Sequence, residues 1–158
     1  MSREYGGSDE ARRIEDGLFL TPAFQALTIG VPFCIFKLLF GLLCIRANAG
    51  LETLGWLIAA WAATDLLMNL TRAVLDIAGR PSPIEYCTIA QAGRLIGRPR
   101  LFLAIDTLLS FSIICISLWS GWIVQLTAAE AHLWYAATTC NLISISAVNI
   151  WLELRRGG

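Results

Sequence analysis

The chain is poor in charged residues and lacks the short motifs that carry chemistry in soluble enzymes. Only 15% of its 158 residues are Asp, Glu, Lys or Arg, whereas soluble domains average about 25%. The 12 basic residues balance the 12 acidic ones, so the sequence has no electrostatic footprint for nucleic acid. It also contains no GxSxG, HExxH, GxGxxG or phosphate-binding loop. We therefore predict no catalytic residues and no nucleic-acid partner.

Residues that bind metals or cofactors are equally sparse. His132 is the only histidine, which excludes a bis-histidine haem and leaves open only a single axial ligand. The cysteines form no CxxC pair and no Cys/His cluster, so spacing supports neither a zinc site nor a disulfide framework. We interpret them as small packing residues and predict no metal and no cofactor. The five cysteines are Cys34, Cys44, Cys87, Cys115 and Cys140.

Apolar sequence is what the chain has in abundance. Hydrophobic residues make up 56% of it, and four runs are each long enough to cross a hydrocarbon core, which takes about 20 helical residues. The predicted spans cover about residues 23–45, 52–77, 101–126 and 131–152. These runs lie in a transmembrane domain at 23–154, which is followed by a tail at 155–158. We expect a kink near Pro32 in the first span.

Two polar segments flank these runs. Residues 1–22 predict an interfacial helix at about 9–20 and no cleavable signal peptide. In the loop at 79–100, Ser82 is followed by Pro83 and Glu85, which is the spacing of a capping box and predicts a surface helix at about 83–96. The predicted fold class is all-α. It is a polytopic membrane protein, an antiparallel four-helix transmembrane bundle with short amphipathic helices on the cytoplasmic face.

The distribution of arginine predicts the orientation of the chain. Cytoplasmic flanks and loops of membrane proteins are enriched in Lys and Arg. Arg46 alone falls in the two loops on one side, and nine arginines fall on the other. We therefore expect an integral protein of a plasma or inner membrane, with both termini in the cytoplasm. The nine are Arg3, Arg12, Arg13, Arg80, Arg94, Arg98, Arg100, Arg155 and Arg156.

Several polar residues lie inside the predicted spans, where a charge costs a helix about 2.5–3.5 kcal/mol and normally has a partner. The four in the second span are spaced i, i+4, i+7 and i+11, so they share one helical face. We predict an intramembrane polar network of Lys37, Asp65, Asn69, Arg72, Asp76 and Asp106.

Depth along the spans predicts the pairs within this network. At about 1.5 Å per residue, Lys37 and Asp65 both lie about 22 Å from the cytoplasmic boundary and can meet. By the same measure Arg72 and Asp106 lie at about 12 and about 9 Å and form a second pair. Arg72 can also pair with Asp76 along the helix. The charges of the network sum to minus one, which leaves one carboxylate without a cation.

Three functions are compatible with this outline. The first is a non-catalytic accessory or assembly subunit that acts through contacts with other membrane-protein subunits or with copies of itself in the lipid bilayer. The alternative is a small oligomeric transporter or channel that uses the intramembrane Asp and Lys residues. A second alternative is a membrane-embedded lipid-modifying enzyme. Small four-span proteins of very different functions share this outline, so the fold alone does not choose among the three.

Overall fold

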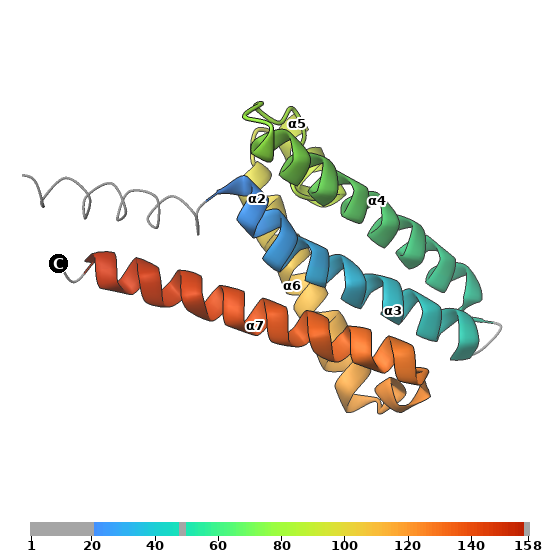
Figure 1. The fold of residues 1–158 in the computed structure, drawn as a ribbon. Helices are drawn as coiled ribbons and strands as arrows, with labels where there is room; N and C mark the ends of the chain where they lie inside the picture. Colours follow the sequence, from blue (N-terminus) through green and yellow to red (C-terminus); the bar gives the residue numbers. More distant parts are fainter. Residues whose placement is uncertain (1–20, 48–49, 157–158) are drawn as a thin grey trace, which may run out of the picture.

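The computed structural model of the protein describes residues 21–47 and 50–156, and these residues form helices and connecting turns without a β-strand (Figure 1). The all-α prediction is therefore confirmed for this part of the chain. The interfacial helix predicted at 9–20 lies outside the described residues. The helices are α2 (Pro22–Gln25), the π-helical turn η1 (Ala26–Gly30), α3 (Val31–Ala47), α4 (Glu52–Ile77), α5 (Thr88–Leu95), α6 (Pro99–Trp119), the 3₁₀ turn η2 (Trp122–Gln125) and α7 (Ala128–Arg156).

Three of these helices are long and apolar enough to cross a membrane. They are the continuous helix Pro22–Ala47, with mean hydropathy 2.2, then α4 with 1.2 and α6 with 2.2. The fourth predicted span corresponds to α7, which has 29 residues but a more polar composition. The third span was predicted to run to residue 126. It ends at Trp119, because Gly121 adopts a left-handed conformation (φ 71°) that terminates the helix.

A π-helical turn, η1, lies just before Pro32, where a kink was predicted. Pro32 has no N–H with which to bond the carbonyl of Thr28, which lies within η1. The Thr28 carbonyl oxygen instead accepts a contact from the Cys140 thiol of α7 at 3.7 Å. The irregular turn thus gives α7 a polar attachment to the first helix.

Helix α3 contacts each of the other three long helices, and Figure 1 shows it between α4 and α7. Its most extensive interface is with α4, where the two backbones approach closely at Gly41 and Gly55. A Cβ atom at Gly55 would lie only 2.6 Å from the Gly41 carbonyl oxygen. Small residues permit such close approach between helices in membranes.

The interface of α3 with α7 contains the main apolar cluster. Phe33, Phe36 and Leu39 of α3 pack with Trp134 and Ala137 of α7, and the rings of Phe36 and Trp134 meet edge to face at 5.0 Å.

An ion pair joins the ends of the same two helices. Arg46 donates two hydrogen bonds to the carboxylate of Glu130, at 2.8 and 2.6 Å. Glu130 also forms a capping box with Thr127, whose hydroxyl accepts from the Glu130 amide while its own amide donates to the carboxylate. The structure therefore has a capping box at a place where sequence analysis did not predict one.

The middle loop contains the predicted surface helix in shortened form, as α5, but the predicted capping box at its start is wrong. Residues 82–87 are not helical, and α5 begins only at Thr88, with the Cys87 sulfur accepting from the Ala90 amide. Ser82 bonds locally to Ile84 instead of capping a helix. Residues 82–87 run back along α4, and we call them the re-entrant loop. They take this course because polar groups on the inner face of α4 bind their backbone. Helix α5 then packs against α6, where Gly93 lies directly against Phe102.

Candidate functional site

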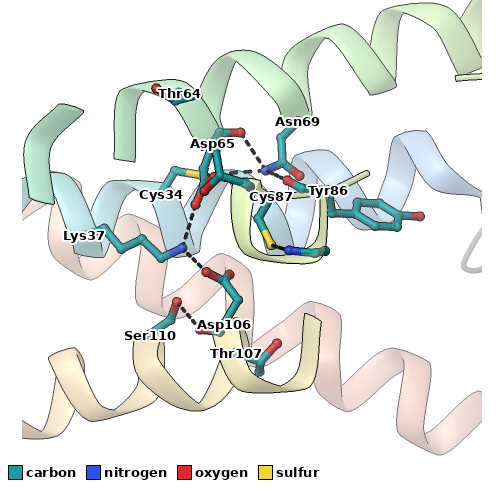
Figure 2. A network of polar contacts seen from close by, with 12 residues as sticks. Cys34, Lys37, Thr64, Asp65, Asn69, Tyr86, Cys87, Asp106, Thr107 and Ser110 are labelled. Carbon is teal, nitrogen blue, oxygen red and sulfur yellow. Dashed lines mark hydrogen bonds and ion pairs between the residues drawn. The ribbon is translucent and has the colours of Figure 1, made fainter. Parts of the chain in front are cut away.

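Lys37 connects three helices at the centre of the molecule. Its ammonium group donates to Asp65 of α4 at 2.8 Å and to Asp106 of α6 at 2.6 Å (Figure 2). It also lies 4.1 Å from the ring centroid of Trp61, one turn before Asp65. We call Lys37, Asp65 and Asp106 the charged centre. It holds one positive and two negative charges, so its formal net charge is minus one.

The two carboxylates differ in their surroundings. Asp65 lies midway along α4 and is fully buried, and its second oxygen accepts the backbone N–H of Thr88 at 2.7 Å. The first N–H of α5 therefore points at a carboxylate, as the positive end of a helix dipole favours. Asp106 keeps 8% of its side chain exposed, and the Cys87 thiol lies within hydrogen-bonding reach of it. Asp106 is thus the more accessible of the two acids.

Asn69 and Arg72 hold the re-entrant loop against α4. The Asn69 amide nitrogen donates to the carbonyl oxygens of Asp65 and Tyr86, at 2.9 and 2.8 Å. Arg72 donates to the Ile84 carbonyl, and its guanidinium group lies 3.9 Å from the centroid of the Tyr86 ring. Irregular backbone within an apolar bundle needs partners of this kind for its peptide groups.

The start of the first helix is fixed by two further contacts. The carboxylate of Asp76 accepts the backbone N–H of Ala23, 2.9 Å away. The Tyr86 hydroxyl donates to the side-chain oxygen of Gln25 at 3.1 Å. Asp76 therefore compensates the N-terminus of a helix and takes no part in the charged centre.

A cavity of about 280 Å³ lies beside the charged centre. Lys37, Asp65 and Asp106 form part of its wall, and apolar side chains of the first helix and α6 form another part. The remaining polar lining comes from the first helix, α4, the re-entrant loop and α6. The complete lining is Gln25, Ile29, Gly30, Phe33, Cys34, Lys37, Asp65, Asn69, Tyr86, Cys87, Leu103, Asp106 and Thr107.

One wall residue outside the long helices has an altered acidity. Burial, together with the nearby charge of Asp106, raises the pKa of the Cys87 thiol to about 12. Cys87 is therefore a neutral thiol at physiological pH. It serves the loop by capping α5.

The structure brings together Lys37 and Asp65, as the depth estimate predicts, but the predicted pairing of Arg72 with Asp106 is wrong. Asp106 binds Lys37 instead, and Arg72 binds the re-entrant loop. Asp76 accepts from Ala23, and no ion pair joins it to Arg72 in the described part of the chain. The physical reason is that the Ile84 carbonyl and the Tyr86 ring of the loop bind the guanidinium group of Arg72.

Sequence analysis missed the contributions of Thr88, Tyr86 and Gln25. Thr88 binds Asp65 through its backbone N–H, and Tyr86 binds Asn69 through its carbonyl, groups that every residue carries and that no side-chain pattern marks. The side-chain contacts of Tyr86 with Gln25 and Arg72 depend on the course of the loop. Trp61 did carry a signal, because it lies four residues before Asp65 and shares its face.

Comparison of the chain with protein-family models, curated proteins and solved structures finds no match. Among residues 21–47 and 50–156, no three His, Cys, Asp or Glu side chains are grouped so as to hold a metal ion. The chemistry of the site is therefore that of two carboxylates, one ammonium group and amide dipoles beside a cavity.

Proposed function

We propose that this protein is a four-span integral membrane protein that binds an ion or a small solute at its charged centre and works as a small transporter, in an oligomer. In this proposal α7 is the fourth span, since its 29 residues extend about 43 Å at 1.5 Å per residue. The arginine distribution supports a cytoplasmic position of both termini and of the α4–α6 connection.

The observation that supports this function is a cavity next to a buried centre with an excess negative charge. A buried net charge is unfavourable unless a proton or a cation neutralises it. The centre lies well inside the helices, as binding sites of secondary transporters do. Re-entrant backbone beside a half-helix such as α5 is also a feature of such sites.

A purely structural role explains these features less well. One Lys–Asp pair would suffice to fix the relative rotation of α3 and α4, and apolar residues often stabilise a core better than a buried ion pair. A second carboxylate adds to the desolvation penalty, and an open cavity loses packing. The second carboxylate and the open cavity are useful only if a ligand occupies the cavity.

The test is flux into liposomes that contain the purified protein. Uptake of protons and of labelled small cations is compared between wild type, Asp106→Asn, and the neutral variant Lys37→Met/Asp65→Asn/Asp106→Asn. Transport predicts that both variants lose flux, while the neutral variant keeps a folded helical structure. Full flux in the folded neutral variant would overturn the proposal. Ser112→Ala, on the exposed face of α6, is the matched control.

The predicted accessory role remains a second proposal, because one observation favours it. Thr139, Ser146 and Asn149 lie on one exposed face of α7, at i, i+7 and i+10. Small and polar residues on a surface otherwise suited to lipid favour contact with another helix. Native extraction distinguishes the two functions, since an accessory subunit comes out with stoichiometric partners of a different sequence. The lipid-modifying enzyme has no comparable observation in its favour.

A further inference from the structure

The cavity has properties that select among possible ligands. Its wall carries the whole charged centre, and Lys37 is the only basic side chain that lines it. The Lys37 ammonium group is already bound to two carboxylates and lies against the Trp61 ring. An anion entering the cavity would find no available cation and would meet a net negative wall. A ligand with one positive charge neutralises the site.

The hydrogen-bonding groups of the cavity wall favour a ligand that donates hydrogen bonds. The side-chain oxygen of Asn69 has no hydrogen-bond partner in the described part of the chain, but it is buried against Gly30 and out of reach of a ligand. Its orientation is fixed, because the amide nitrogen of the same side chain donates to two carbonyl oxygens. The acceptor that a ligand in the cavity reaches is therefore the carboxylate of Asp106, which keeps 8% of its side chain exposed. Asp106, on the same wall, accepts more than one hydrogen bond.

The size and the apolar part of the wall indicate an organic ligand. The volume of about 280 Å³ is near the lower end of the usual range for small-molecule pockets, about 300–1,000 Å³. Ile29, Phe33 and Leu103 line it beside the polar groups. A bare metal ion would leave these side chains uncontacted, and a lipid would not fit inside.

We infer that the cavity binds a compact organic monocation with N–H donors, a primary or secondary ammonium compound, and that the ammonium group binds Asp106. This inference rests on the proposed function, because it names the class of solute that the charged centre would bind. The apolar part of the ligand lies against Phe33 and Leu103. The ligand shares Asp106 with Lys37.

Calorimetric titration of the full chain in lipid nanodiscs tests this. The probes are benzylammonium, n-butylammonium and methylammonium, with benzyl alcohol as the neutral counterpart, and empty nanodiscs correct for partitioning. We expect benzylammonium to bind at least about tenfold more tightly than benzyl alcohol, and Asp106→Asn to weaken it at least about tenfold. Leu103→Trp fills the cavity without removing a charge and should abolish binding. Leu108→Trp, on the same helix but 67% exposed, is the matched control and should bind normally.

Two results would overturn the inference. One is equal affinity for the amine and the alcohol, and the other is unchanged amine binding in a folded Leu103→Trp variant. If no ammonium compound binds wild type but flux still depends on Asp106, the ligand class is wrong and the transport proposal stands. If flux is also independent of Asp106, both fail. Should Asp106→Asn not fold, the comparison of Leu103→Trp with Leu108→Trp still decides the outcome.

Discussion

Lys37 is the residue on which the arrangement of the helices depends most. Two carboxylates from two other helices neutralise it, and each of the three groups is less than one-tenth exposed. A buried charge left without its partner is far less favourable than the pair. The three residues therefore act as a unit. The effect of a single substitution on stability reflects mainly the buried charges that are left without a partner.

We predict that Lys37→Met lowers the free energy of unfolding by about 3–5 kcal/mol, the usual effect of breaking a buried ion pair. The two carboxylates would remain buried with no cation between them. Neutralising both acids in the same chain should restore most of the loss, because no buried charge then remains. Equilibrium unfolding in mixed micelles measures each variant. Equal stability of the single and the neutral variants would show that the charges do not couple.

Cys87 reports on the environment at the start of α5. With its pKa at about 12 instead of the usual 9.0, the thiol should react slowly with a small uncharged alkylating reagent. Because only the thiolate reacts, the rate should rise about 100-fold from about pH 8 to about pH 10, whereas a thiol of ordinary pKa gains only about tenfold. Alkylation is followed in a variant with the other four cysteines replaced by alanine. A plateau near pH 10 would contradict the buried placement of the loop.

At the scale of the elements, the close approach of α3 and α4 is set by two glycines. A Cβ at Gly55 would lie 2.6 Å from the Gly41 carbonyl oxygen and 2.7 Å from the Ile45 amide nitrogen, both of which are backbone atoms. Neither can move without separating the helices. The interface also carries the Lys37–Asp65 contact, so its spacing determines whether the charged centre closes.

We predict that Gly55→Ala destabilises the protein by about 1–3 kcal/mol, the usual effect of overpacking, and weakens any ligand binding that depends on the charged centre. Ala63→Val on the exposed face of the same helix is the control and should change stability little. Unfolding in mixed micelles measures both variants. A Gly55→Ala variant as stable as wild type would mean that the two backbones do not touch.

The helices were predictable from the sequence and the re-entrant loop was not. Hydropathy over windows of about 20 residues identifies the long helices, because the hydropathy of a segment depends only on its own residues. The loop at 82–87 forms because Asn69 and Arg72 bind its peptide groups and Asp65 binds the N–H of Thr88 that follows it. Peptide groups are the same in any sequence. Local spacing at Ser82 therefore predicted a helix start that tertiary contacts override.

The depth estimate failed for Asp106 for a different reason. It assumed that all spans begin at one level, which puts Asp106 about 13 Å nearer the boundary than Lys37. The two residues are nevertheless in contact at 2.6 Å, so the helices do not begin at a common level. Helix α6 crosses behind α3 in Figure 1 rather than running parallel to it. Helix tilt is set by packing and anchors, which residue counting does not include.

For the molecule as a whole, the number of spans determines the side on which the chain ends. Three helices meet the length and hydropathy expected of a span, and α7 is the additional helix of the proposal. Three spans would place the two ends of the chain on opposite sides of the membrane, and four would place them on the same side. The position of the end of α7 is therefore a direct test of whether α7 crosses.

We predict that a green fluorescent protein fused after Arg156 is fluorescent in bacterial cells and that alkaline phosphatase at the same place is inactive, because the proposed topology puts that end in the cytoplasm. Fusions after Arg80 should behave in the same way, since the same topology puts the arginine-rich α4–α6 connection on that side. Fusions after Thr127, between η2 and α7, should give the opposite pair of results. An active phosphatase after Arg156 together with an active one after Thr127 would show that α7 does not cross. The charged centre would then have to be explained within three spans, with α7 lying along the surface.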